Sequence, residues 1–416
     1  MGESPRTMSP ARPIRDLLLL YVTAFLRALS TGLIGVLLGI YLAKLGFNAA
    51  QIGYVIGAGL AGGACATLLV TLTGDRFGRK RALVCIAMFG AVGGLAAAVA
   101  STFSTILAAA FLGMLNGMGR DRGAALVLEQ AILPATTTDE TRTRAFAWNN
   151  VLQDAGHAIG SLLAGAPYLF RAVFPVGEIT SFRLAVGLAA TFILLTAVLY
   201  LGLSPVVEAP AAQKKVPVTP ETRRILFRLS SLFAVDALAG GFLVSSLLSY
   251  FFYRRFGITE GAVAVLFFAA RGLNALSHLG AAWLAKRIGL VNTMVFTHIP
   301  SSVFLLTVAF APSFPVAAAL FLLREGLVEM DVPTRQSYVM AVVRPEERTV
   351  ASGVTHLVRV GAWAVAPSFA GALMQGVSLG IPIMIGAGMK IAYDLLLYVA
   401  FRKAKPPEET VKAGKI

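Results

Sequence analysis

The sequence predicts an all-α membrane protein of twelve transmembrane helices, arranged as two pseudo-symmetric bundles of six. Three observations lead to this fold class. The 416 residues are 57% hydrophobic and only 14% charged, and their mean hydropathy of +0.75 lies far outside the averages of soluble proteins. Apolar stretches of roughly 20 residues, the length that crosses a bilayer, recur along almost the whole chain. A single polar segment divides them into two groups of six.

The apolar stretches place the individual spans. They are expected at 17–45, 49–73, 82–100, 105–128, 145–168, 183–203, 229–252, 261–285, 292–311, 315–332, 350–374 and 379–401. The segment 204–226 is rich in proline and basic residues, so it is expected to be a cytoplasmic linker. An N-terminal bundle at 17–203 and a C-terminal bundle at 227–401 follow, with cytoplasmic tails at 1–16 and 402–416.

The formal net charge of +15 reflects topology. The basic residues lie in short loops between apolar segments, and this arrangement argues against a nucleic-acid partner, which requires one folded basic face. A cytoplasmic N-terminus puts most loop lysines and arginines inside and leaves chiefly Lys44, Arg171, Arg254 and Arg255 outside, as the positive-inside rule requires. We therefore expect an integral protein of a prokaryotic inner membrane, with both termini in the cytoplasm.

The turn after the second span carries the most specific motif. Residues 74–81 read Gly-Asp-Arg-Phe-Gly-Arg-Lys-Arg, and this stretch, with Leu83 just after it, resembles the loop between helices 2 and 3 of the major facilitator superfamily of secondary transporters. The loop after the eighth span, 284–289, repeats the pattern with Lys286 in place of the acid. A weak parallel repeat of this kind fits two related bundles with a site between them near the midplane.

The resemblance implies alternating access and a charged cytoplasmic gate. In the family, the inner loop pairs with the acidic ends of helices four and ten and with the arginines that follow, so Asp75 and Arg79 are expected to join Glu129, Arg142 or Arg144. Charges that merely extend to the lipid headgroups are the alternative. The expected gate residues are Asp75, Arg76, Arg79, Arg120, Glu129, Arg142, Arg144, Glu329 and Asp331.

Ionisable residues inside spans are costly, so they are functional candidates. Spans five, eight and eleven each carry a polar stripe at helical spacing, whereas spans three, six, nine and twelve hold few such residues and are expected to face lipid. Three stripes at comparable depth indicate one shared cavity. The expected substrate-binding residues are Arg27, Asn150, Gln153, Tyr250, Arg271, Asn274, Arg324, Arg359 and Trp363.

The excess of arginine at this depth favours an anionic or zwitterionic small organic solute. Arginine stays charged and presents a rigid fork that suits carboxylate or phosphate. Carboxylates and imidazoles can exchange a proton during a cycle, so proton coupling is expected through Asp154, His157, Asp236 and Glu325. Structural ion pairs, such as Asp154 with Arg359 and Asp236 with Arg27, are the alternative.

Other function classes fit less well. The sequence has no glycine-rich phosphate loop and no clustered metal ligands, so we expect that the protein is not an enzyme and holds no cofactor or metal. Cys65 and Cys85 are expected to be small apolar residues that fill space in the helix packing. The protein is expected to be a monomer. Proton-driven drug or metabolite efflux remains an alternative, although Ser161 follows Gly160 where the glycine-rich signature of the family's exporters has proline. A lipid flippase is a third possibility.

Overall fold

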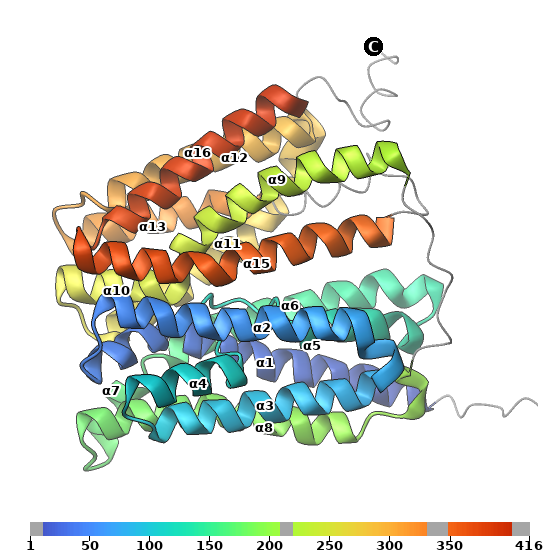
Figure 1. The fold of residues 1–416 in the computed structure, drawn as a ribbon, viewed down its shortest axis with the longest axis horizontal. Coiled ribbons are helices and arrows are strands. Elements are labelled where there is room, and N and C mark those ends of the chain that lie inside the picture. Colours follow the sequence, from blue (N-terminus) through green and yellow to red (C-terminus); the bar gives the residue numbers. More distant parts are fainter. Residues whose placement is uncertain (1–10, 209–218, 331–347, 402–416) are drawn as a thin grey trace, which may run out of the picture.

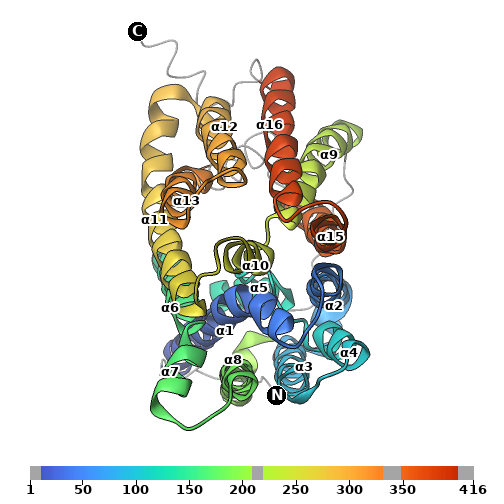
Figure 2. The ribbon, with the colours of Figure 1, turned by 90° about the vertical axis from the view of Figure 1, so that its left-hand side faces the viewer.

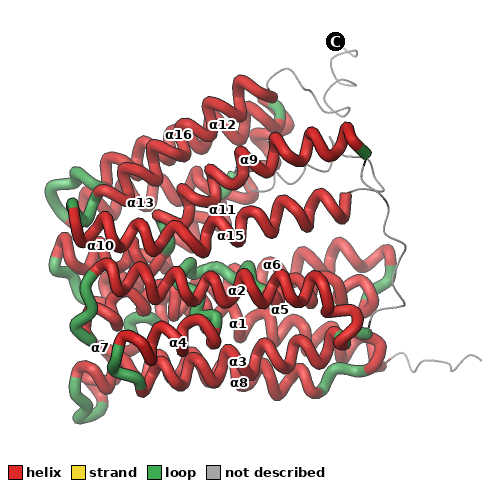
Figure 3. Tube along the Cα trace, in the orientation of Figure 1, coloured by secondary structure: helices red, strands yellow, loops and turns green. Residues whose placement is uncertain are grey.

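The structure is a computed structural model, and it describes residues 11–208, 219–330 and 348–401 (Figure 1). Within these ranges the chain forms fifteen α-helices and two 3₁₀ helices, and no strand occurs among the described residues (Figure 3). Eight helical stretches in the described part are long and apolar enough to cross a membrane. The prediction of an all-α membrane protein is confirmed.

The N-terminal half contains eight of these α-helices. They are α1 (Ala11–Lys44), α2 (Ala49–Phe77), α3 (Arg79–Val99), α4 (Phe103–Gly113), α5 (Ala124–Ile132), α6 (Asp139–Leu163), α7 (Ala166–Val173) and α8 (Glu178–Leu201), with the 3₁₀ helices η1 (Leu133–Thr136) and η2 (Pro205–Val207). The C-terminal half contains α9 (Pro220–Phe242), α10 (Ser245–Phe256), α11 (Glu260–Ile288), α12 (Leu290–Val308), α13 (Phe314–Val328), α15 (Arg348–Gly376) and α16 (Ile381–Phe401). Since α4 with α5, α6 with the short α7, and α9 with α10 each correspond to one predicted span, the fold is consistent with twelve spans.

Spans four and seven are both broken near their middle. Span four leaves the helix between Met114 and Gly123, where Met114 (φ +50°) and Gly119 (φ +75°) are in the left-handed region, which ends helices readily. Span seven is interrupted at Leu243 and Val244. The two breaks meet, because the backbone N–H of Ser246 donates to the carbonyl of Gly117 at 3.0 Å. Discontinuous helices of this kind often form binding sites in transporters.

The two halves are joined at the end of the molecule opposite the start of α1 and the end of α16, which we call the outer end (Figure 1). There α2 packs against α15, α6 against α11 and α1 against α10. Figure 2 looks onto this end and shows α10 between α1 and the C-terminal helices. Arg171 forms an ion pair with Glu260 across the halves, and the backbone N–H of Ala49 donates to Gln375 Oε1 at 3.2 Å.

Some helix ends lie outside the apolar stretches. Helix α9 begins at Pro220, inside the expected linker, because Thr219 caps the N–H of Thr222 at 3.4 Å and proline favours the first helical position. Helix α1 likewise begins at Ala11 rather than 17. Hydropathy marks the buried length of a helix, whereas capping residues mark its ends.

The repeat between the halves extends to the backbone. Gly78, between α2 and α3, has φ +97°, and Gly289, between α11 and α12, has φ +88°. Both glycines join two helices directly in the left-handed region that glycine adopts without a steric penalty. The two loops that resemble each other in sequence therefore turn in the same way.

Candidate functional site

A cavity of about 130 Å³ lies between the helix breaks and the C-terminal half; we call it the central cavity. Its wall contains six cationic residues against three acidic ones. The cationic residues are Arg120, Arg122, Arg271, Arg324, Arg359 and Lys390, and the acidic ones are Asp236, Glu325 and Glu329. The described wall is therefore predominantly positive.

One ion pair crosses the central cavity from one half to the other. Arg120, in the unwound part of span four, donates through Nη1 to Oε2 of Glu329 at the end of α13, at 2.8 Å. Within the C-terminal half, Arg324 contacts its neighbour Glu325, whose other oxygen accepts from Asn274 at 2.8 Å. Glu329 and Glu325 therefore both lie against arginines.

Arg271 of α11 holds the broken span four. Its Nη2 donates to the carbonyl of Gly119 and to Ser245 Oγ, both at 3.0 Å, and Ser245 Oγ donates to the carbonyl of Met118 at 2.9 Å. Carbonyls that a continuous helix would satisfy internally are thus bonded by the opposite half. This explains how an unwound segment is tolerated at membrane depth.

Trp363 of α15 lies between two guanidinium groups. The Arg122 guanidinium carbon is 4.9 Å from its ring centroid, and that of Arg359 is 4.7 Å away, within the range of cation–π attraction. The indole is 7% exposed. It lines the central cavity and also a second cavity in the N-terminal half.

A buried polar cluster joins α9, α12 and α16. Lys390 Nζ lies 2.9 Å from Asp236 Oδ1 and 3.4 Å from His298 Nε2, and His298 Nδ1 lies 2.9 Å from Asp394. Arg359 lies 3.7 Å from the other oxygen of Asp236. The expectation that spans nine and twelve simply face lipid is wrong, because each turns a polar face inward to Asp236.

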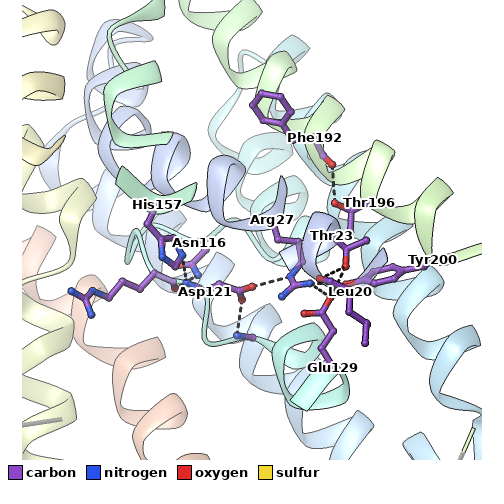
Figure 4. A network of polar contacts seen from close by, with 12 residues as sticks. Leu20, Thr23, Arg27, Asn116, Asp121, Glu129, His157, Phe192, Thr196 and Tyr200 are labelled. Carbon is purple, nitrogen blue, oxygen red and sulfur yellow. Dashed lines mark hydrogen bonds and ion pairs between the residues drawn. The ribbon is translucent and has the colours of Figure 1, made fainter. Parts of the chain in front are cut away.

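A second cluster lies inside the N-terminal half (Figure 4). Arg27 Nε donates to Asp121 Oδ2 at 2.8 Å, and its Nη1 contacts Glu129 and donates to Tyr200 Oη at 2.6 Å. Tyr200 and Thr23 both donate to the same oxygen of Glu129, at 2.6 and 2.9 Å. Arg27 therefore pairs within its own half, rather than with Asp236 as the alternative interpretation had it.

Glu129 is buried completely, which corrects the expectation that it pairs with the cytoplasmic loop. A buried carboxylate must be satisfied by donors in direct contact, and α5 brings it to Arg27 instead. The loop after α2 is attached elsewhere: the carboxylate of Glu208 accepts from the backbone N–H of Arg79 at 2.7 Å, and Arg79 Nη1 donates to the carbonyl of Ala131 at 3.1 Å.

Comparison with known proteins decides the family. The family model described as Major Facilitator Superfamily matches residues 20–367, which is most of the chain. The protein belongs to the major facilitator superfamily. The superfamily assignment made from the loop motif is confirmed, and the chain is a multi-pass membrane protein of a transporter family.

Relatives of this superfamily member differ in how much of it they match. The uncharacterized membrane protein YJR124C of Saccharomyces cerevisiae is 25% identical and covers 93% of this chain and 94% of its own length. Multidrug resistance protein MdtG of Escherichia coli is 29% identical, over 38% of this chain and 39% of its own length. The nucleoside transporter NupG has a TM-score of 0.73 at 16% identity, covering 92% of this chain and 98% of its own, which shows a shared fold.

In this superfamily member, six residues predicted as binding or coupling groups line the central cavity: Asp236, Arg271, Arg324, Glu325, Arg359 and Trp363. Arg120 and Glu329, expected at the cytoplasmic gate, line it too. Arg27 lines the second cavity. His298 and Lys390 lie in spans nine and twelve, which were expected to face lipid. The available signals were their location in otherwise apolar spans and, for Lys390, its helical spacing of four residues from Asp394.

The other predicted residues lie away from the described wall. Six are outside it: Asn150, Gln153, Asp154, His157, Tyr250 and Asn274. Asn150 and Asp154 are exposed on α6, and His157 Nε2 accepts the backbone N–H of Asp121 at 2.9 Å, so a proton on that nitrogen requires this bond to break. Arg76, Arg142 and Arg144 are exposed near the end opposite the outer end. The side chain of Asp75 and all of Asp331 lie outside the described residues.

Cys65 and Cys85 are both exposed. The expectation that they are apolar fillers of the helix packing is therefore wrong. Each lies on the surface of its helix, α2 or α3, where the two helices face a common groove.

Proposed function

We propose that this transporter moves a small organic anion or zwitterion through the central cavity by alternating access. The observation that carries the proposal is the composition of the wall, with six cationic groups against three acids. Fixed positive charge in a low-dielectric site is costly without a counter-charge, and an anionic substrate supplies one. Arg271 and Arg359 are the proposed primary ligands, since their planar guanidinium groups can bind a carboxylate in a bidentate way.

Substrate binding is proposed to act on the ion pair between the halves. A substrate carboxylate near Arg120 competes with Glu329 for the same guanidinium and weakens the 2.8 Å bridge. Ligands shift a conformational equilibrium by their differential affinity for its states. Loosening this bridge is therefore a direct route from binding to movement of one half against the other.

Proton coupling is proposed through Asp236 and Glu325. Both carboxylates line the central cavity, and each is in contact with a cation, Lys390 for Asp236 and Arg324 for Glu325. A carboxylate that loses its cationic partner to a substrate becomes a candidate for protonation.

The cytoplasmic gate is proposed to act in the state with the opposite opening. In that state, the loop carrying Arg76 and Arg79 closes the cytoplasmic end together with Arg142 and Arg144 of α6.

The described state is proposed to be closed on the outer side. The ion pair between Arg171 and Glu260 and the packing of α2 on α15 join the halves at that end. With both termini in the cytoplasm, as the loop charges predict, the outer end faces away from the cytoplasm.

A second candidate is efflux of drugs or other amphiphilic metabolites. It is favoured by the partial match to a protein named for multidrug resistance. The two candidates differ in the charge of the preferred solute, because the wall described here repels organic cations.

A binding panel tests the proposal. The purified protein is heated with benzoate, benzylamine or benzyl alcohol, which share a ring and differ in charge, and the melting temperature is measured. A ligand present at 100 times its Kd adds about 2.7 kcal/mol of stability. We expect stabilisation by benzoate-type anions; stabilisation by the amines alone would favour cationic drug efflux.

A further inference from the structure

The second cavity lies mostly inside the N-terminal half and has a volume of about 140 Å³; we call it the inner cavity. It lies beside the unwound part of span four and is lined by residues on both sides of the break, Gly113–Asn116 and Arg120–Ala125. Helices α1, α2, α3 and α8, with Val360 and Trp363 of α15, supply most of the remaining wall, which is mostly apolar. A cavity of similar size in another protein holds a benzene molecule.

The inner cavity adjoins the central cavity. Met118, Arg120, Arg122 and Trp363 line both. The partition between the two cavities is therefore made of these side chains, with Arg122 stacked on Trp363.

The inner cavity also reaches toward the bilayer. A surface groove of about 330 Å³ runs between α2, α3 and the end of α4, and Ile86 and Met114 line both the groove and the inner cavity. Large exposed apolar side chains form the groove, among them Leu69, Phe89 and Leu112. Such a surface faces lipid, and Ile86 and Met114 lie between the groove and the inner cavity.

The polar end of the inner cavity suits an anion. Three arginines line it, Arg27, Arg120 and Arg122, against one acid, Asp121, among the described residues of its wall. Arg27 is 5% exposed, and its Nη2 is buried without a hydrogen-bond partner, although its other two nitrogens are bonded. A buried donor without a partner is costly, and a ligand oxygen would satisfy it.

We propose that the inner cavity and groove bind a single-chain anionic amphiphile, such as a fatty-acid-like carboxylate, that enters from the bilayer. Its head lies between Arg27 Nη2 and Arg122, and its chain extends past Ile86 and Met114 into the groove. Rotation of Arg122 and Trp363 passes the head into the central cavity. This proposal rests on the proposed anion transport and names the substrate class of that function.

Tryptophan quenching tests the proposal. In a Trp148→Phe, Trp283→Phe background, Trp363 is the one remaining tryptophan, since the chain has three. The protein, in nanodiscs, is titrated with 2-bromoundecanoate, whose bromine lies next to the carboxylate head and quenches indole at close range, and with 2-bromoundecanol as the neutral match. We expect saturable quenching by the acid at a lower concentration than by the alcohol.

Two glycine variants locate the chain. Gly63 lines the inner cavity and a Cβ there meets open space, so Gly63→Leu fills the cavity without a clash. Gly187 on α8 is equally open and lines neither cavity, so Gly187→Leu is the matched control. Excluding about two methylene groups from burial weakens binding about tenfold. Equal affinities of the two variants for bromoundecanoate would overturn the proposal.

The two cysteines give an independent readout that needs no variant. Cys65 and Cys85, the only cysteines in the chain, lie on opposite sides of the groove. Decanoate is expected to slow the alkylation of both cysteines by N-ethylmaleimide at concentrations where acetate does not. Equal alkylation rates in decanoate and in acetate would contradict the presence of an acyl chain in the groove. Binding of benzoate together with failure of both the quenching and the alkylation test would show that the amphiphile site is wrong, while the proposed anion transport stands. If bromoundecanol binds as tightly as the acid and benzoate does not bind, the proposed preference for anions is itself wrong.

Discussion

The guanidinium group of Arg122, in the broken fourth span, stacks on the indole of Trp363 in α15, with its central carbon 4.9 Å from the ring centroid. This contact joins the two halves at the point where the central and inner cavities adjoin. A movement of one half against the other must therefore change the partition between the cavities. The first prediction follows from this position.

Replacement of Trp363 by leucine is expected to weaken the partition and also remove two cation–π contacts. Contacts of this kind contribute about 0.5–2 kcal/mol each, so the free energy of unfolding should fall by a few kcal/mol at most. The measurement is thermal unfolding in detergent, with Trp283→Leu as control, because Trp283 is exposed and carries a single such contact, with Arg287. A larger loss in the control would contradict the central position of Trp363.

The bridge between Arg120 and Glu329 predicts a charge-reversal rescue. Each side chain is partly buried, so Glu329→Gln should cost about 1–3 kcal/mol by leaving Arg120 without the negative charge that pairs with it. The reversed pair, Arg120→Glu with Glu329→Arg, should recover part of that loss in thermal unfolding. A reversed pair less stable than either single reversal would show that the two residues do not interact across the halves.

Glu129 is predicted to be structural. Because it is completely buried and bonded by Arg27, Tyr200 and Thr23, Glu129→Gln should destabilise the N-terminal half by about 3–5 kcal/mol. Glu178→Gln is the control, since Glu178 forms an exposed pair with Lys44 and such pairs contribute about 0–1 kcal/mol. If Glu129→Gln left stability unchanged but altered gating, Glu129 would be a residue of the cytoplasmic gate and not a structural one.

Asp236 is predicted to link protons to transport. Asp236→Asn removes a group that can be protonated in the cavity wall but keeps its size, so uptake of benzoate driven by an imposed pH gradient in proteoliposomes should fall at least about tenfold, while benzoate exchange persists. Asp16→Asn is a suitable control, because Asp16 lies near the start of α1, away from the central cavity, and accepts a hydrogen bond from the backbone N–H of Ser204. Uptake driven by the pH gradient that persists in Asp236→Asn would show that Asp236 does not couple protons to transport.

The fold and part of the site could be predicted from sequence because both leave periodic signals. The length of the apolar stretches predicted the spans, and the repeated loops predicted the two related halves. Gly78 and Gly289, at corresponding positions in these loops, both have a positive φ angle. Arginine and acid residues inside apolar stretches identified most of the charged residues in the described wall of the central cavity. These signals are local to one helix each.

The features that sequence reasoning missed depend on contacts between helices. The break between Met114 and Gly123 contains glycines, which weaken a helix, but the contacts that stabilise it come from Arg271 and Ser245 of the other half. Partner choice also depends on packing between helices: Arg27 faces Asp121 and Glu129 rather than Asp236, and Lys390 lies against both Asp236 and His298. The inner cavity lies beside the unwound part of the fourth span and is lined by several helices, so no pattern within one helix predicts it.

Binding of benzoate to matched arginine variants tests the central claim most directly. The Arg271→Gln, Arg359→Gln double variant removes two cations from the cavity wall, whereas Arg254→Gln, Arg255→Gln removes two exposed cations from the outer end of α10. Calorimetric titration of both, folded to the same extent, should show benzoate affinity reduced at least about 100-fold in the first variant, as two lost charge-assisted hydrogen bonds imply. Affinity in the second should remain near wild type. Equal benzoate affinity in the two variants would contradict an anion site in the central cavity.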